Sequence, residues 1–160
     1  MPSGPAGAVC REDLSAHPGR VAYSVRGWVR MAERSLDWLR QAEADLRHAR
    51  NSRDDEDFNW SAFAAHQAAE KAIKAVFQKQ HLDAWGHTLS VLLENLPPGG
   101  RPSADLIDAA KELDKHYIPT RYPNGFERGA PVDFYTRREA ELAIANAEML
   151  LEWCRRQIGR

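Results

Sequence analysis

Apolar residues recur at intervals of three and four along most of the chain after Met31, and this spacing constrains the fold more than any other feature. Such intervals bring apolar side chains to one face of an α-helix. We find no segment that alternates apolar and polar residues over the length of a strand. The pattern therefore predicts an all-α protein. The first apolar series consists of Leu36, Leu39, Ala42, Leu46 and Ala49.

Four further helices are predicted after this one. They cover residues 58–80 and residues 87–96, then a stretch that begins at Ser103, and finally a stretch that follows Thr136. Each carries apolar residues at helical spacing, which are expected to face the core. In chain order these positions are Ala62, Ala65, Ala69, Ile73 and Val76; Leu89, Leu92, Leu93 and Leu96; Leu106, Ile107, Ala110 and Leu113; and Ala140, Ile144, Ala147, Leu151, Cys154 and Ile158.

Residues that begin or end helices mark the boundaries of these segments. The polar run NSRDDED (51–57) is expected to connect the first two helices, and PPGGRP (97–102) ends the third because proline cannot continue a helix. Ser103 is a suitable N-cap, and Thr136 with Glu139 forms the pattern of a capping box. Short connectors favour antiparallel neighbours, so we expect an up-and-down bundle of four to five helices with one long ordered loop before the last helix.

Residues 1–30 differ from the rest of the chain, because they are rich in glycine, proline, serine and arginine and show no sustained period. We expect a disordered N-terminal extension there and a folded domain over residues 31–160. The net charge of −1 argues against a general affinity for nucleic acids. Cys10 and Cys154 have no CxxC partner, which is typical of a cytoplasmic protein. No apolar run approaches the roughly 20 residues that cross a membrane.

The long connection before the last helix begins with DKHYIPTRYPNG, residues 114–125. In a functional interpretation Arg121 holds a phosphate, Tyr117 or Tyr122 stacks on a base, and Asp114 orients the arginine. In a structural interpretation Asp114 and Arg121 form a salt bridge that fixes the loop, while the tyrosines pack. The two prolines stiffen the segment in either case. An ordered loop is expected, and both interpretations stay open.

A polar stripe on the second predicted helix is the other candidate site. His66, Glu70 and Lys74 are spaced four residues apart, and Lys71 lies beside them. His66 and Glu70 could contribute to a metal site, but no third ligand is evident, so no metal or other cofactor is expected. The stripe is otherwise either an exposed face with a Glu70–Lys74 ion pair, or part of a cleft beside Arg121.

His87 and the tryptophans have simpler interpretations. His87 follows Trp85-Gly86 and precedes a helix, so it is expected to cap that helix or to pack on Trp85. Trp38, Trp60, Trp85 and Trp153 are expected in the core or at a contact between subunits.

Four segments of the chain together carry a resemblance to a known family. They are AHQAAEKAIKAVF (65–77), WGHTLSVLLENL (85–96), ELDKHYIPTRYPNG (112–125) and YTRREAELAIANAEMLLEW (135–153). In this order they resemble the HEPN domain, named for higher eukaryotes and prokaryotes nucleotide-binding, in its stand-alone prokaryotic form, over about residues 31–158. The resemblance implies a helical bundle that is commonly a homodimer and is often the partner of a minimal nucleotidyltransferase. It also implies a relationship to metal-independent ribonucleases and to toxins of toxin–antitoxin pairs.

The ribonucleases of this family carry an arginine and a histidine separated by four to six residues, and this chain departs from that signature. Phe126, Glu127 and Arg128 occupy the positions where a histidine should follow Arg121, and no histidine occurs after His116. Acid–base cleavage of RNA needs a group that transfers protons. The leading interpretation is therefore a non-catalytic module that binds a nucleotide or a nucleotidyltransferase, with Arg121, Lys71 and Lys74 capturing phosphate. The alternatives are a ribonuclease toxin that acts through His116 or Tyr117, and a purely structural interaction module.

Overall fold

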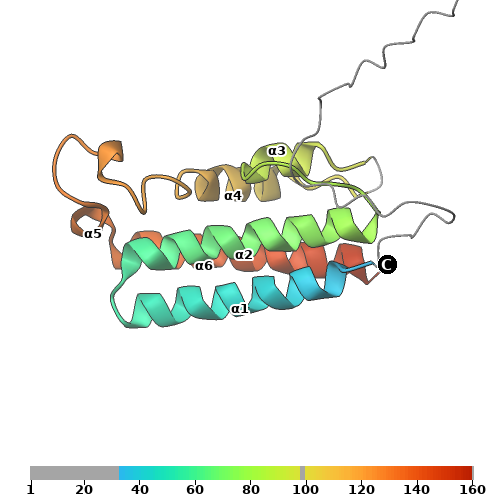
Figure 1. The fold of residues 1–160 in the computed structure, drawn as a ribbon, viewed down its shortest axis with the longest axis horizontal. Helices are drawn as coiled ribbons and strands as arrows, with labels where there is room; N and C mark the ends of the chain where they lie inside the picture. Colours follow the sequence, from blue (N-terminus) through green and yellow to red (C-terminus); the bar gives the residue numbers. More distant parts are fainter. Residues whose placement is uncertain (1–32, 98–99, 160) are drawn as a thin grey trace, which may run out of the picture. The chain divides into compact units, whose positions relative to one another are not determined.

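Every regular element of the computed structural model, which describes residues 33–97 and 100–159, is a helix. Four longer helices alternate in direction along the chain (Figure 1), which confirms the predicted up-and-down bundle. The expected disordered extension, residues 1–30, lies outside the described residues. The elements are α1 (Ser35–Asp54), α2 (Phe58–Lys79), α3 (Leu89–Glu94), α4 (Ala104–Asp114), the 3-10 turn η1 (Pro123–Gly125), α5 (Pro131–Phe134) and α6 (Arg137–Ile158).

Two of the predicted caps are present at the atomic level. Ser103 Oγ accepts a hydrogen bond from the Leu106 amide at 3.4 Å and so begins α4. At the start of α6 the Thr136 amide donates to the Glu139 carboxylate at 2.8 Å, and the Glu139 amide donates back to Thr136 Oγ1 at 3.5 Å. Both caps satisfy amide groups that have no partner within the helix. The predictions for these two boundaries are confirmed.

Other boundaries differ from the prediction. The helix α1 continues to Asp54, so the connector to α2 is only residues 55–57, and Glu56 makes the turn with φ of 66°. The helix α3 spans residues 89–94 rather than 87–96, with Thr88 at its N-cap. The long loop that was predicted before the last helix holds two short helical elements, η1 and the single turn α5. A polar connector and a short helix both leave boundaries weakly specified.

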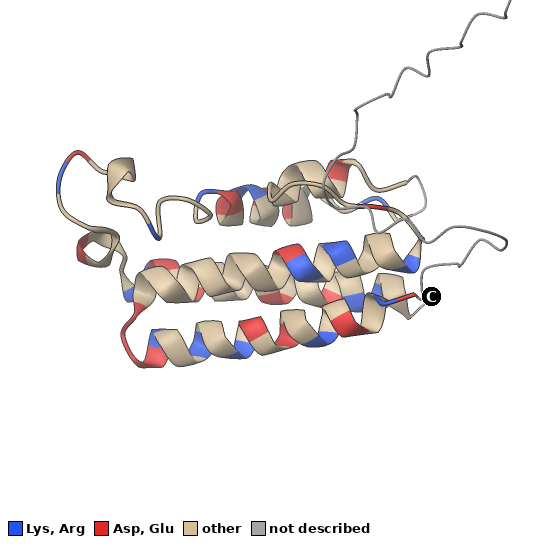
Figure 2. Ribbon diagram, in the orientation of Figure 1, with Lys and Arg blue, Asp and Glu red and all other residues tan. Residues whose placement is uncertain are grey.

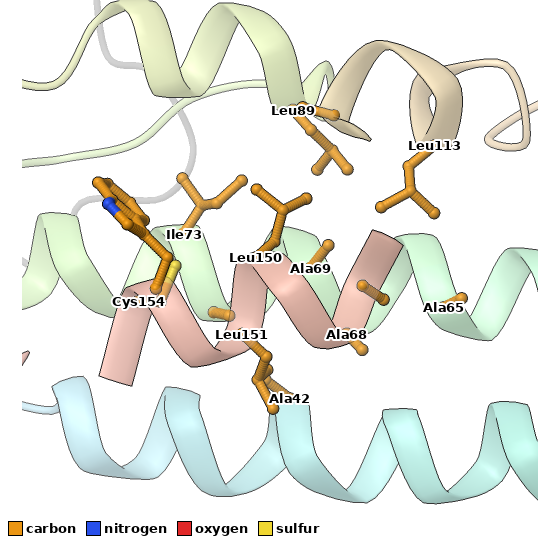
Figure 3. Packing of buried hydrophobic residues seen from close by; sticks show 14 of the residues in the cluster. Ala42, Ala65, Ala68, Ala69, Ile73, Leu89, Leu113, Leu150, Leu151 and Cys154 are labelled. Atoms are coloured by element: carbon orange, nitrogen blue, oxygen red, sulfur yellow. The ribbon is translucent and has the colours of Figure 1, made fainter. Parts of the chain in front are cut away.

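The core lies where α2 packs between α1 and α6. The inward face of α2 is built mainly of alanine, and small side chains let neighbouring helices approach closely. In Figure 3, Leu150 and Ile73 lie between α6 and α2, while Leu151 points toward Ala42 of α1. Leu89 and Leu113 bring α3 and α4 onto the same cluster.

Most predicted core positions are buried, with a few exceptions. Leu36 is 63% exposed, so the apolar face of α1 begins at the partly buried Leu39. Trp153 is in the core as expected, whereas Trp85 is 87% exposed and Trp60 is about half exposed, so for these two the predicted core position is excluded and the predicted contact between subunits stays a prediction. Cys154 is fully buried, and its burial raises the pKa of its thiol. Cys154 is therefore an ordinary core side chain.

Charged residues cover the outer surface of α1 and α6, whereas the first half of α2 carries none (Figure 2). Arg50 Nη2 lies 2.7 Å from Glu148 Oε1, and Arg155 Nη2 lies 2.8 Å from Glu43 Oε1. Exposed pairs of this kind contribute on the order of 0.5 kcal/mol each. None of the described helices is long and apolar enough to cross a membrane.

Candidate functional site

The second face of α2 carries buried polar side chains, where the sequence suggested an exposed polar stripe. His66 is fully buried, and Glu70 is 5% exposed. The predicted Glu70–Lys74 ion pair is present, with Nζ 2.9 Å from Oε1, but both of its side chains are largely buried. The interpretation of this stripe as an exposed face is therefore wrong. A buried carboxylate has to be balanced by several partners.

Three side chains donate hydrogen bonds to the Glu70 carboxylate. Lys74 Nζ lies 2.9 Å from Oε1, Gln67 Nε2 lies 3.3 Å from Oε2, and His87 Nδ1 lies 3.1 Å from each oxygen. Burial raises the pKa of Glu70, but the bonds from Lys74 and His87 outweigh it, so the net pKa is lowered. Glu70 is therefore ionised at neutral pH. Since a carboxylate can only accept, His87 carries a proton on Nδ1.

His66 holds the loop that carries His87. Its Nε2 lies 3.1 Å from the His87 carbonyl oxygen, and because a carbonyl can only accept, Nε2 bears the proton. Nδ1 lies 3.4 Å from Gln67 Nε2, whose amide also contacts Glu70. Burial lowers the pKa of His66 to about 4, although Glu70 acts in the opposite direction. His66 is thus a neutral hydrogen-bonding residue.

His66, Glu70 and His87 converge, so a third potential ligand joins the pair that the sequence suggested. The described residues nevertheless contain no group of three that could hold a metal ion. The reason lies in the hydrogen bonds: one nitrogen of His66 faces a carbonyl group, and the nitrogen of His87 nearest to Glu70 carries a proton. The arrangement suits hydrogen bonding and not metal coordination.

Asp114 does not contact Arg121 within the described residues, so the expected salt bridge and the expected orienting of the arginine by Asp114 are both wrong. Its carboxylate accepts from the Leu89 amide at 2.5 Å, from the Ser90 amide at 3.2 Å and from Ser90 Oγ at 2.6 Å. Asp114 is the last residue of α4, and it caps the first turn of α3 from outside that helix. An anionic cap at a helix N-terminus is stabilising, and here it also fixes the chain just after His87.

Arg121 is held by its own segment and by aromatic rings. Nε and Nη2 donate to the Tyr117 carbonyl oxygen at 3.0 and 2.7 Å. Its Cζ atom lies 4.3 Å from the ring centroid of Phe63, 4.9 Å from that of Tyr117 and 5.1 Å from that of Tyr122. We call these four residues the Arg121 platform. Phe63 belongs to α2, so the platform lies against the helix that carries His66 and Glu70.

Tyr117 connects the Arg121 platform to the two histidines. Its ring centroid lies 4.8 Å from that of His87, with the planes 15° apart, and 5.0 Å from that of His66. The sequence had suggested Trp85 as the packing partner of His87, which is wrong because Trp85 is exposed. The stacking on Tyr117 places an imidazole and a guanidinium next to one aromatic ring.

The two lysines do not join Arg121. Lys71 Nζ lies 2.6 Å from Asp45 of α1 and 3.2 Å from Gln67 Oε1, so it faces the other side of α2. It lines a groove of about 200 Å³ between α1 and α2, together with Trp60 and Phe63. Lys74 is occupied by Glu70. The expectation that these lysines capture phosphate beside Arg121 therefore has no support in their contacts.

The segment 116–120 is ordered and tied to α2, as expected for the long loop. Asn59 Nδ2 of α2 donates to the Thr120 carbonyl oxygen at 3.0 Å, and Thr120 Oγ1 donates to the His116 carbonyl oxygen at 2.7 Å. His116 Nδ1 lies 3.2 Å from Tyr135 Oη, and burial lowers the pKa of His116. His116 therefore packs inside the structure and is poorly placed to transfer protons to a ligand.

Sequence reasoning missed Phe63 and the contact of His87 with Glu70. Phe63 falls on α2 about one turn before His66, so the helical period places it beside the candidate site. His87 was expected to cap a helix or to pack on Trp85. The signal that the sequence offers is the preceding Gly86, whose φ of 93° favours glycine.

The family model for the HEPN domain matches residues 35–157. The crystal structure of TT1696 from Thermus thermophilus is 44% identical, with a TM-score of 0.77, and the match covers 78% of this chain and 98% of that one. A HEPN domain protein from Thermotoga maritima, TM0613, is 34% identical with a TM-score of 0.64 over 78% and 98% of the two chains.

Two further relatives extend the comparison to archaea. The crystal structure of ST0689, an archaeal HEPN homologue, is 40% identical with a TM-score of 0.67, and the match covers 78% of this chain and 97% of that one. A Methanocaldococcus jannaschii protein with the name "Putative toxin MJ1304" is 27% identical over 124 residues, which are 72% of this chain and 82% of the relative.

Proposed function

This chain belongs to the HEPN domain family, and on that premise we propose that the Arg121 platform binds the phosphate and base of a nucleotide or of a nucleic acid. One observation carries the proposal. Within the described residues Arg121 has no carboxylate partner, although a carbonyl group and three aromatic rings hold it in place. The donors on Nη1 are left for a ligand.

The neighbouring rings suit the remainder of such a ligand. Tyr122 is about half exposed, and its ring lies beside the guanidinium. Stacking of a base on an aromatic ring contributes about 1–3 kcal/mol and does not depend on the sequence of the nucleic acid. A guanidinium fork binds phosphate with two parallel hydrogen bonds. The platform therefore offers charge and stacking surface together.

Calorimetric titration with ATP, related nucleotides and a single-stranded oligonucleotide tests this proposal. Arg121→Ala should weaken binding at least tenfold while lowering the free energy of unfolding by only about 1 kcal/mol, because it removes cation–π contacts and hydrogen bonds to one carbonyl. Arg128→Ala, which changes an exposed arginine in the same segment, is the matched control and should bind like the wild type. Absence of binding to the wild-type protein would end the proposal.

A second candidate function is that of a toxin, which the name of the Methanocaldococcus relative favours, and a ribonuclease is the kind of toxin that the family resemblance implies. Expression of the full chain in a bacterial host should then arrest growth, and co-expression of an antitoxin should restore it. Unimpaired growth at high expression would remove this candidate.

We further propose that the chain works in the cytoplasm as a homodimer beside a nucleotidyltransferase. The exposed Trp85 and the half-exposed Trp60 provide apolar surface of the kind found in subunit contacts. Light scattering should give twice the mass of the chain, and a co-expressed nucleotidyltransferase should co-purify. A monomer that retains no partner would leave the chain as a binding module that acts alone.

A further inference from the structure

The groove between α1 and α2 combines two aromatic rings with an ion pair that joins the two helices. The ring centroids of Trp60 and Phe63 lie 6.0 Å apart in an edge-to-face arrangement, and Lys71 of α2 pairs with Asp45 of α1. The groove measures about 200 Å³, which is less than the roughly 300–1,000 Å³ of sites for drug-sized ligands. It therefore has room for one flat ring system and not for a whole nucleotide.

Phe63 is shared by the groove and the Arg121 platform. Arg121 Cζ lies 4.3 Å from the Phe63 ring centroid, and the same side chain lines the groove. A ligand that extends from Arg121 across Phe63 thus enters the groove. Arg121 also lies beside Tyr122, whose ring centroid is 5.1 Å from Cζ. The guanidinium therefore has two places beside it where a base can stack, which is the arrangement that sites for single-stranded nucleic acid use.

Lys71 supplies the donor that can discriminate between bases in the groove. Its Nζ lies 3.2 Å from Gln67 Oε1 and 2.6 Å from Asp45 Oδ2. These contacts occupy two of the three donors of an ammonium group, so one donor remains for a ligand. The Lys71 side chain is 24% exposed, so this donor can be reached.

The other polar groups of the groove are committed or do not discriminate. Asp45 Oδ2 is buried, and Oδ1 accepts from Gln41 Nε2 at 2.7 Å, so Asp45 holds Lys71 in place. The Gln67 amide is bonded to the buried polar side chains of α2. His48 is exposed, and a neutral imidazole carries both a donor and an acceptor, so it favours neither purine. The choice of base therefore rests on Lys71.

The free donor of Lys71 favours guanine over adenine. Guanine presents two acceptors, O6 and N7, on one edge, whereas adenine presents the donor N6 amino group beside N7. An ammonium group cannot accept, so the amino group of adenine meets a second donor there. In single strands the bases are free to stack on aromatic rings while this edge is read.

We propose that the groove holds a guanine base of a single-stranded nucleic acid, whose adjoining phosphate is bound by Arg121 and whose neighbouring base stacks on Tyr122. This inference rests on the proposed binding function and names the ligand as a strand rather than a free nucleotide. Trp60 then lines the ligand groove, and among the described tryptophans the exposed Trp85 is left for a contact between subunits.

Anisotropy titrations with labelled thymidine strands that differ in one central base test the proposal on the full chain. The central base is thymine, adenine, guanine, hypoxanthine or a guanine analogue with carbon in place of N7. Guanine and hypoxanthine, which share O6 and N7, should bind about fivefold or more tightly than adenine, and the analogue should lose part of this gain. Deoxy strands carry no 2′-hydroxyl group, so a ribonuclease activity does not disturb the measurement.

Lys71→Met removes the donors and keeps the length of the side chain. The affinities for the guanine and adenine strands should then agree within twofold, and the thymine strand should bind as it does to the wild type. Lys111→Met, at an exposed lysine of α4, is the matched control and should keep the preference for guanine. Asp45→Asn combined with Lys71→Met leaves no unpaired charge, and this double variant serves as the test if Lys71→Met alone does not fold.

Arg121→Ala shows whether the groove and the Arg121 platform hold one ligand. The variant should weaken binding of the guanine and thymine strands by the same factor, and an unchanged affinity for the guanine strand would contradict a shared ligand. A wild-type protein that binds all five strands equally, or a folded Lys71→Met variant that keeps the preference, would overturn the inference while the binding function stands. Failure of the wild type to bind any strand would overturn both.

Discussion

The apolar face and the polar face of α2 have different roles in the molecule. One face is built of alanines such as Ala65 and Ala69, which carry no polar group and allow α1 and α6 to approach. The other buries His66 and Glu70 within a network of hydrogen bonds that reaches His87 and the loop before α3. Apolar packing stabilises the bundle, whereas a buried carboxylate adds little net stability even when it is well paired. The polar face is therefore better explained by the residues that it positions, namely His87 and the loop before α3.

The largest expected effect tests the apolar face. Leu150→Ala should lower the free energy of unfolding by about 3 kcal/mol, because it leaves a cavity where α6 meets α2. Denaturant unfolding measures the change. Binding of nucleotide to the folded variant should match the wild type at a temperature well below the unfolding transition. A matching loss of affinity would show that the two faces are not independent.

The second prediction concerns the loss of stability at acid pH that follows from the buried His66 on the polar face. Burial depresses the pKa of His66 from 6.5 to about 4, so the unfolded chain binds a proton in this range that the folded chain does not. Above pH 6.5 His66 is neutral in both the folded and the unfolded chain, so its burial costs no stability there. As the pH falls from 6.5 to 4, the free energy of unfolding falls by about 3 kcal/mol. The lowered pKa values of Glu70 and His116 act in the same direction.

The His66→Gln variant isolates this term. Glutamine can still donate to the His87 carbonyl oxygen but does not titrate, so the variant should unfold with a shallower dependence on pH between 4 and 6.5. Equal slopes for the two proteins would contradict the burial of His66.

A smaller effect is expected at the cap that Asp114 provides. Asp114→Ala removes the acceptor for two amides at the start of α3, and losses of this kind amount to about 1–2 kcal/mol. Asp108→Ala changes an exposed aspartate of the same helix and should alter stability by less than about 0.5 kcal/mol. Thermal unfolding compares the two variants. Equal effects would mean that the cap is not formed in solution.

The smallest expected effect is that of Trp85→Ala. Trp85 is 87% exposed in the single chain, so at concentrations where the chain is monomeric its loss should change the free energy of unfolding by less than about 0.5 kcal/mol. Trp153→Ala, in the core, is the contrasting variant and should destabilise the chain about as much as Leu150→Ala. Denaturant titrations of both variants at several protein concentrations measure these changes. A loss at Trp85 that grows with protein concentration would support the proposed contact between subunits, and a loss that does not would contradict it.

The apolar face was predictable and most of the polar face was not. Periodicity identified the buried stripes of α2 and α6 because a helix repeats at a fixed interval, and local patterns identified the caps at Ser103 and Thr136. The contacts of Glu70 with His87 join residues 17 positions apart, and those of Asp114 with Leu89 join residues 25 apart. No helical period relates such pairs. Arg121 was singled out from the sequence, but its partners are rings rather than the acid that sequence proximity suggested.

The cap that links α4 to α3 also has a consequence for local unfolding. Asp114 ends one helix and holds the first turn of the other, so α3 cannot fray without losing its attachment to α4. The two helices should open as one cooperative unit, with matched hydrogen-exchange protection of their amides. His87 lies just before this unit and Tyr117 just after it. A single opening event would thus separate the imidazole from its stacking partner and dismantle the site while α1, α2 and α6 stay folded.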